Sequence, residues 1–180
     1  EEIAKNGGGI VSSINGVRMS SAEELYLKAL KRMDRYISLG TTSIEAKSGY
    51  GLDTESELKS LEVIEKTNSN HCIDLAPTFM GAHAFPPEYE NDHEGYVRLI
   101  IKDMIPRVAH QGIAKYIDVF CEEGYFSIAQ TRSILECGLE HGLTPRIHAD
   151  EFNNFGASQL ASDVGAVSAD HLMAIDDKSI

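Results

Sequence analysis

The hydrophobic positions of this chain follow two alternating patterns, one with helical spacing and one in short continuous runs. After the polar stretch 20–24, which is typical of a helix start, apolar side chains form a helical stripe as far as Gly40. This stripe consists of Leu25, Leu27, Ala29, Leu30, Met33, Ile37 and Leu39. Comparable stripes predict further helices at about 53–64, 97–108, 127–141 and 157–164. Pro106 lies within the stripe 97–108, so we expect a kink or a break there.

Short runs rich in β-branched and other apolar residues lie between the predicted helices. They predict strands at 41–47, 72–80, 116–121, 146–149 and 166–171. Strand and helix alternate without a hairpin signal, so the sheet should be parallel with right-handed connections. Both a doubly wound sheet and a closed barrel fit this alternation. No Gly-x-Gly-x-x-Gly turn follows a strand, which removes the main reason to choose a dinucleotide-binding sheet.

Polar residues gather at the carboxyl ends of the predicted strands, where (β/α) barrels carry their chemistry. They are Lys47 with Tyr50, His83, Glu122 with Glu123, His148 with Asp150 and Glu151, and Asp170 with His171. Lys47 and the acids have a structural alternative as a ring of ion pairs at the barrel mouth. For Tyr50 and His83 the structural alternative is packing within a loop. For His171 it is capping a helix. Because structural residues are not expected to coincide at one edge, we predict an α/β fold of the TIM-barrel type with a site there.

The chain is shorter than the barrel that this pattern predicts. A (β/α)8 barrel has eight strands and typically about 250 residues, whereas this sequence has 180 residues and five predicted strands. Residues 1–6 resemble the last turn of a helix that stops at a run of three glycines, and residues 176–180 resemble a helix start. We therefore expect residues 1–180 to form a partial barrel with about five βα units. Such an open arc would leave two apolar edges.

Composition and charge narrow the range of partners. The chain is 42% hydrophobic and 24% charged, as globular proteins usually are. Sixteen basic against 28 acidic residues give a formal net charge of −12, which repels phosphate backbones and anionic lipid. No apolar run approaches the roughly 20 residues of a membrane span, and the first residues show neither a signal peptide nor an initiator Met. We therefore predict a small-molecule ligand and neither a nucleic acid nor a membrane.

The cysteines indicate the redox environment. The chain has three cysteines, Cys72, Cys121 and Cys137, which is an odd number. None of them forms a Cys-x-x-Cys pair. Cys72 and Cys121 lie in apolar strand-like runs, where a free thiol behaves as a small hydrophobe. A disulfide framework is therefore not expected, and a reducing compartment, by default the cytoplasm, is predicted.

His148 is the residue around which the other candidates are arranged. It ends a short strand, and two carboxylates follow it before a turn-rich polar loop. A neutral imidazole suits a transition metal, and Glu151, three residues on, can lie near such an ion without being a ligand. A lone histidine beside solvated acids is the structural alternative at this position.

Five motifs at these strand ends resemble the imidazolonepropionases, amidohydrolase-superfamily enzymes of histidine breakdown. The motifs are Lys47-Ser-Gly-Tyr-Gly-Leu52, Gly81-Ala-His-Ala84 with Pro86-Pro87-Glu88, Asp118-Val-Phe-Cys-Glu122, His148-Ala-Asp-Glu151 and Ser168-Ala-Asp-His-Leu172. They occur in the family's order and spacing and span essentially the whole chain. Together they are specific to the family rather than only to the superfamily.

The resemblance implies a (β/α)8 barrel with a small β-sandwich, one Zn or Fe ion per complete chain, and a homodimer. It implies ring-opening hydrolysis of 4-imidazolone-5-propanoate to N-formimidoyl-L-glutamate. By position, His148 matches a metal ligand, and Tyr50 and His83 match substrate-binding residues. Glu151 matches the residue that binds the imidazolone ring and helps to handle the water. His171 matches the histidine beside the metal-bound water.

Several parts that the resemblance implies fall outside this sequence. They are the β-sandwich, barrel strands 1, 7 and 8, a His-x-His pair, a substrate-binding Arg and an Asp ligand. Since a catalytic metal usually needs three protein ligands, we expect the 180 residues alone to be inactive. Two alternatives stay open: another amidohydrolase, such as a cyclic amidase or deaminase, and a non-catalytic barrel remnant without a metal.

Overall fold

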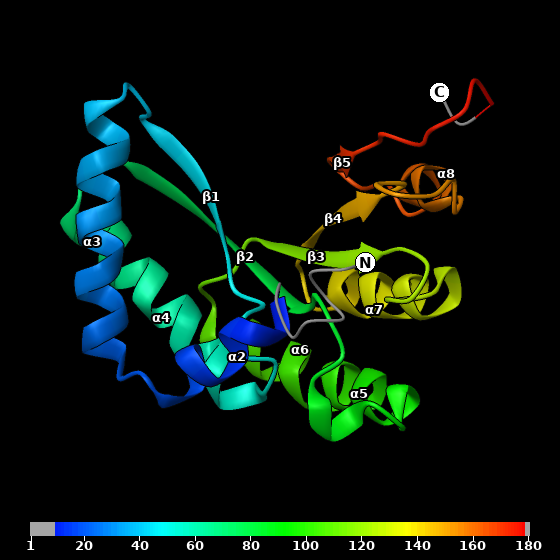
Figure 1. The fold of residues 1–180 in the computed structure, drawn as a ribbon, viewed down its shortest axis with the longest axis horizontal. Coiled ribbons are helices and arrows are strands. Elements are labelled where there is room, and N and C mark those ends of the chain that lie inside the picture. Colours follow the sequence, from blue (N-terminus) through cyan, green and yellow to red (C-terminus); the bar gives the residue numbers. More distant parts are fainter. Residues whose placement is uncertain (1–9, 179–180) are drawn as a thin grey trace.

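The computed structural model describes residues 10–178 and forms a curled half-barrel of five parallel strands with helices on its outer face (Figure 1). The strands are β1 (Ser43–Lys47), β2 (Asp74–Ala82), β3 (Tyr116–Cys121), β4 (Thr144–Ala149) and β5 (Ala169–His171). They lie side by side in chain order, and each is parallel to the next. The predicted α/β fold is confirmed, with the curvature of part of a TIM-type barrel.

Several of the helices begin where the sequence places capping residues. They are α2 (Ile10–Met19), α3 (Ala22–Ser38), α4 (Thr54–Asn70), α5 (His93–Leu99), α6 (Ile105–Gln111), α7 (Ile128–Glu140) and α8 (Ala157–Asp163), with a 3-10 turn at Pro87–Tyr89. Ser21 and Ser127 each form a capping box, and Asp53 accepts the Ser56 N–H at the start of α4. Helix α2 was not predicted, because Gly16 and several serines are weak helix formers and hide its pattern.

The helical run after β2 is irregular at the point where Pro106 predicts it. A π-helical turn, Ile100–Met104, joins α5 to α6, and the proline occupies the first turn of α6. Pro lacks an N–H and its ring clashes with the carbonyl four residues earlier, so a regular α-helix is disfavoured there. The wider π turn absorbs this conflict while Ile100, Met104 and Ile105 remain fully buried.

Three expectations near the element ends need correction or fall outside the described residues. Strand β2 begins at Asp74, and Cys72 is exposed, so its predicted packing as a small hydrophobe is wrong. Ile73 and Leu75 are buried instead, because alternate residues of an extended chain face the core. The predicted helix end at 1–6 lies outside the described residues. The predicted helix start at 176–180 lies partly within the described residues, where residues 177–178 form a turn.

The main core lies between the outer face of the sheet and its covering helices. It includes Leu61, Phe79, Tyr96, Ile117, Phe126, Ile134, Leu135 and Ile147, all buried. Helix α7 approaches β3 so closely that a Cβ on Gly138 would lie 2.7 Å from Ile117 Cγ2. Burial of each large apolar side chain contributes about 1.5–3 kcal/mol, so this layer fixes the curvature that the strand ends share. Among the helices of residues 10–178, none has the length and apolar character to cross a membrane.

Candidate active site

The carboxyl ends of the strands form the mouth of the half-barrel, and the strained backbone of the molecule gathers there. Within residues 10–178, the non-glycine residues with positive φ are Leu52, Asp150, His171 and Leu172. Each lies at, or a few residues beyond, the end of β1, β4 or β5. Such strain persists only where the surroundings enforce it, and it is common at functional sites.

The five side chains singled out in the sequence form one continuous row across this mouth. The ring centroids of Tyr50 and His83 lie 5.1 Å apart, and those of His83 and His148 lie 6.3 Å apart. The row continues to His171, whose ring centroid is 5.2 Å from that of His148. It ends at Glu151, with 3.4 Å between His171 Nε2 and Glu151 Oε2. We call these residues the mouth row; the structure brings all of them together.

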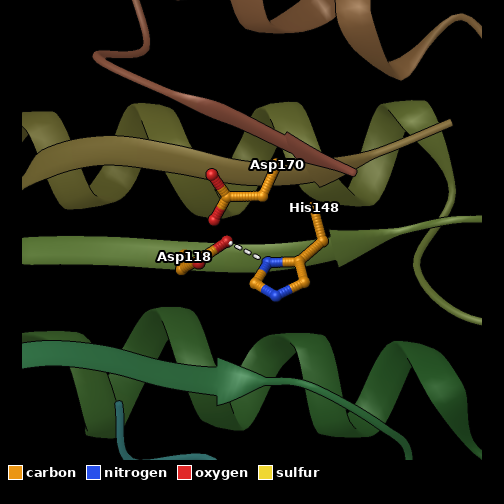
Figure 2. Close-up of side chains that lie close together, drawn as sticks. All are labelled: Asp118, His148 and Asp170. Carbon is orange, nitrogen blue, oxygen red and sulfur yellow. Dashed lines mark hydrogen bonds and ion pairs between the residues drawn. The ribbon is translucent and has the colours of Figure 1, made fainter. Parts of the chain in front are cut away.

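His148 is oriented by a buried carboxylate on the neighbouring strand (Figure 2). Its Nδ1 lies 3.0 Å from Asp118 Oδ1, and Asp118 is fully buried. Burial opposes ionisation, but the hydrogen bond from His148 and the ammonium of Lys47 keep the pKa of Asp118 below its usual value. An ionised Asp118 only accepts, so His148 Nδ1 carries a proton, and in the neutral ring the lone pair lies on Nε2. This is the arrangement in which metal-binding histidines are usually found.

Asp118, His148 and Asp170 together offer ligand atoms within 4.8 Å of one another, close enough to surround one ion (Figure 2). The ammonium of Lys47, however, lies against both carboxylates, with Nζ 2.6 Å from Asp118 and 3.6 Å from Asp170. A cation among all three groups would meet this ammonium. Of these groups, His148 Nε2 is the donor atom that the contacts of Lys47 and Asp118 leave available to a transition metal, with Asp118 orienting the ring.

Beneath the mouth row the inner face of the sheet is polar. Lys47 Nζ also lies 2.8 Å from Glu45 Oε1, and Thr78 donates a 2.6 Å hydrogen bond to the same oxygen. Arg146 Nε lies 3.4 Å from Glu45, and the Arg146 guanidinium stacks over the Tyr116 ring. For Lys47 the structural alternative is therefore correct, because it belongs to a ring of ion pairs.

Glu122 and Asp150, two acids at the predicted strand ends, hold loops rather than face the site. Glu122 accepts the N–H groups of Phe152 and Asn153, which ties the loop after β3 to the loop after β4. Asp150 accepts three backbone N–H groups at the start of α8. Burial opposes ionisation in both, but these hydrogen bonds keep each pKa below its usual value. Both acids are therefore structural.

His83 is a neutral hydrogen-bonding group. Its Nδ1 lies 2.9 Å from the carbonyl oxygen of Gly49, which only accepts, so Nδ1 carries the proton and Nε2 is an acceptor. Burial lowers the pKa of His83 to about 4. Gly49 has φ +93°, and a Cβ there would lie 2.5 Å from the Met80 carbonyl oxygen, so only glycine allows this contact.

Sequence reasoning missed three residues that organise the site. Asp118 lies inside the quoted strand motif, where an acid in the middle of an apolar strand was an available signal. Glu57 and Arg18 hold the loop after β1 and carried no such signal. Glu57 reads as an ordinary first-turn acid of a helix, and Arg18 lies on the unpredicted helix α2.

Comparisons with known proteins identify close sequence relatives. The chain is 51% identical to an imidazolonepropionase of Shouchella clausii, over 95% of this chain and 38% of that protein. It is 50% identical to that of Brevibacillus brevis and 48% identical to that of Geobacillus thermodenitrificans, each over 99% of this chain and 42% of the relative. No family model matches. A solved carboxyl transferase domain of Rhizobium etli pyruvate carboxylase aligns over 69% of this chain and 20% of its own, with 14% identity and a TM-score of 0.39, too low to support an argument.

The matched region extends over nearly the whole of this chain but spans only about two fifths of the relatives' length. Within it lie all five motifs and the whole mouth row. The resemblance seen in the motifs is thereby confirmed: this chain is similar throughout to one segment of the imidazolonepropionases.

Proposed function

We propose that the complete protein containing this chain is a metal-dependent hydrolase. It opens the ring of 4-imidazolone-5-propanoate to give N-formimidoyl-L-glutamate. The observation that carries the proposal is the mouth row, in which a tyrosine, three imidazoles and a carboxylate lie in sequence across one barrel mouth. The names of relatives about 50% identical to this chain support the same reaction.

The two ends of the mouth row divide the work. Tyr50 and His83 orient the planar ring, the first through its hydroxyl and the second through its Nε2 acceptor. Glu151 takes the proton from the attacking water and passes it to the ring nitrogen as the C–N bond breaks. His171, next to Glu151, donates a hydrogen bond to the oxygen on which negative charge develops. Such directed polar contacts disfavour analogues that lack the ring's hydrogen-bonding edge.

A zinc or iron ion would be bound by His148 Nε2, with its other protein ligands supplied from outside this chain. When bound, the ion supplies Lewis acidity that polarises the carbonyl and activates water. Asp118 keeps the proton on His148 Nδ1, which leaves Nε2 available. Burial lowers the pKa of Lys47, but Asp118 and Glu45 raise it above its usual value, so Lys47 remains a cation that balances the acids.

Several features of the complete protein belong to this proposal. Residues 1–180 form the central part of its catalytic barrel, and it acts in histidine degradation as a cytoplasmic homodimer. The net charge of −12 supports a small-molecule substrate in place of nucleic acid.

The test is whether the complete protein opens imidazolonepropionate under anaerobic conditions, which protect an oxidisable substrate. We expect formation of N-formimidoyl-L-glutamate, with about one equivalent of Zn or Fe per chain. Release of ammonia from a different ring would favour the deaminase alternative. Absence of both turnover and metal would favour a non-catalytic remnant.

A further inference from the structure

Glu57 makes contacts that its place in helix α4 does not require. Its side chain is fully buried and accepts the N–H of Gly49 at 2.6 Å, of Gly51 at 3.1 Å and of Leu52 at 3.0 Å. The start of α4 is already capped by Asp53. Burial raises the pKa of Glu57, and the hydrogen bonds from Ser48 and the three N–H groups oppose this shift by stabilising the carboxylate. The Glu57 carboxylate therefore stabilises the loop after β1 and not the start of helix α4.

Arg18 holds the same loop through its carbonyl groups. From helix α2 its guanidinium donates to the carbonyl oxygens of Gly51 at 2.7 Å and of Leu52 at 3.2 Å. The guanidinium is itself fixed by ion pairs of 2.8 Å to Asp53 and 2.6 Å to Glu88. Glu57 therefore binds backbone N–H groups of the loop 48–52, and Arg18 binds backbone carbonyl groups of the same loop. We call this pair the loop clamp.

The loop clamp controls two members of the mouth row. Gly49, whose N–H is bound by Glu57, turns its carbonyl to His83 Nδ1 and so determines which nitrogen of that ring is protonated. Tyr50 lies between the clamped residues, with its ring edge-on to His83 at an interplanar angle of 86°. Leu52, at φ 55°, is held in a strained conformation by contacts on both of its polar groups.

We infer that Glu57, with Arg18 as its counterpart, is a positioning residue that acts through the loop 48–52. It fixes His83 as a neutral acceptor at Nε2 and aims it at an N–H of a planar heterocyclic substrate. This inference rests on the proposed function and adds the chemical feature selected: a ring N–H donor. An N-methylated ring lacks the donor and loses the hydrogen bond to this partly buried acceptor, which contributes about 0.5–1.5 kcal/mol, or roughly 2- to 12-fold in affinity.

The test compares the complete wild-type protein with Glu57→Gln and with Glu65→Gln, a control on the exposed face of the same helix. A long-range ¹H–¹⁵N spectrum reports the protonated nitrogen of His83, and steady-state kinetics report KM and kcat. In the wild type we expect the Nδ1–H form and slow hydrogen exchange at Gly49 and Gly51. Glu57→Gln should mix the two tautomers and raise KM about tenfold with a smaller change in kcat. It should also weaken the preference for an N–H ring over its N-methyl analogue, whereas Glu65→Gln should match the wild type.

Arg18→Ala serves as a second variant, because the loss of the buried acid in Glu57→Gln can prevent folding. Arg18→Ala should shift KM and the His83 tautomer in the same direction as Glu57→Gln. The inference fails if either folded variant keeps the wild-type tautomer and KM. It also fails if Gly49 and Gly51 exchange rapidly in the wild type. If the wild type does not open imidazolonepropionate, the proposed function fails instead, and the tautomer and exchange measurements still decide whether the clamp positions His83.

Discussion

The two ends of the mouth row are held in different ways. On the β1–β2 side, Tyr50 and His83 depend on a loop whose backbone N–H and carbonyl groups are bound by buried or half-buried charges. On the β4–β5 side, Glu151 and His171 contact each other at 3.4 Å between Glu151 Oε2 and His171 Nε2. His148 lies between these ends and is fixed by Asp118.

This difference matches the two tasks proposed for the site. Orienting a planar ring requires hydrogen-bonding groups that do not move, since misplacement by about 1 Å can cost 100-fold in rate. Moving a proton requires groups that change protonation state and partners within each turnover. We therefore expect the rigid end to govern substrate capture and the looser end to govern turnover.

The largest effect is expected where the two ends meet. His148→Ala in the complete protein removes the proposed metal ligand. Because loss of an outer partner alone costs about 10- to 100-fold in metal affinity, loss of the ligand itself should cost more. Metal content and turnover should fall together, as measured by elemental analysis and kinetics. His110→Ala, at an exposed histidine of α6, is the matched control. Full metal occupancy in His148→Ala would show that the ligand assignment is wrong.

The next largest effect is expected at the looser end. Glu151→Gln keeps the size of the side chain but removes the base, so kcat should fall by about 10²–10⁴-fold while metal content is unchanged. Glu123→Gln, at an exposed acid of the neighbouring loop, should alter kcat less than about twofold. Near-wild-type turnover in Glu151→Gln would show that Glu151 is a solvated acid without a role in catalysis.

At the rigid end, pH should separate His83 from an ordinary exposed histidine. Its pKa of about 4 lies below the usual 6.5, so as pH falls through this window the unfolded chain takes up the proton first. Native stability should therefore drop between pH 6.5 and 4, by about 3 kcal/mol at most, and not further from this group below pH 4. The C–H resonances of His83 in NMR spectra should titrate near pH 4. A midpoint near 6.5 would contradict the burial-driven shift.

The smallest effect is expected at Tyr50. Tyr50→Phe removes one hydroxyl hydrogen bond, which contributes about 0.5–1.5 kcal/mol, so KM should rise roughly 2- to 12-fold. Metal content should be unchanged, because the hydroxyl belongs to the substrate side of the row. Tyr36→Phe, at an exposed tyrosine of α3, is the control. A fall in kcat with unchanged KM would place Tyr50 in the chemical step instead.

The fold was predictable because short runs rich in β-branched and apolar residues alternate with apolar stripes of helical spacing. The strand positions and the parallel order follow from that alternation. The helix caps at Ser21, Asp53 and Ser127 are residue types that favour a helix start. Strand ends were less exact: β5 spans only Ala169–His171, although Val167 and Ser168 before it also form backbone hydrogen bonds to β4.

The mouth row was predictable in its members but not in its support. Parallel strands bring their carboxyl ends to one edge, so residues distant in sequence were expected to meet there. Which groups hold them depends on contacts between elements that no spacing reveals. Glu57 and Arg18 are 39 positions apart and meet only at the loop 48–52. Asp118 and His148 pair across two strands whose register is set by the core beneath them.

The order of the strands bears on how the chain acquires its structure during synthesis. Every strand pairs with the one made just before it, about 20 to 40 residues earlier. A growing polypeptide can thus add one strand and its covering helix at a time to a sheet that is already in place, from the amino end onward. The loop clamp is complete once the 3-10 turn at Pro87–Tyr89 has emerged, before β4 delivers His148. On this route the loop that carries Tyr50 and holds His83 takes its final structure first, and His148, the proposed metal ligand, is added to a sheet that is already formed.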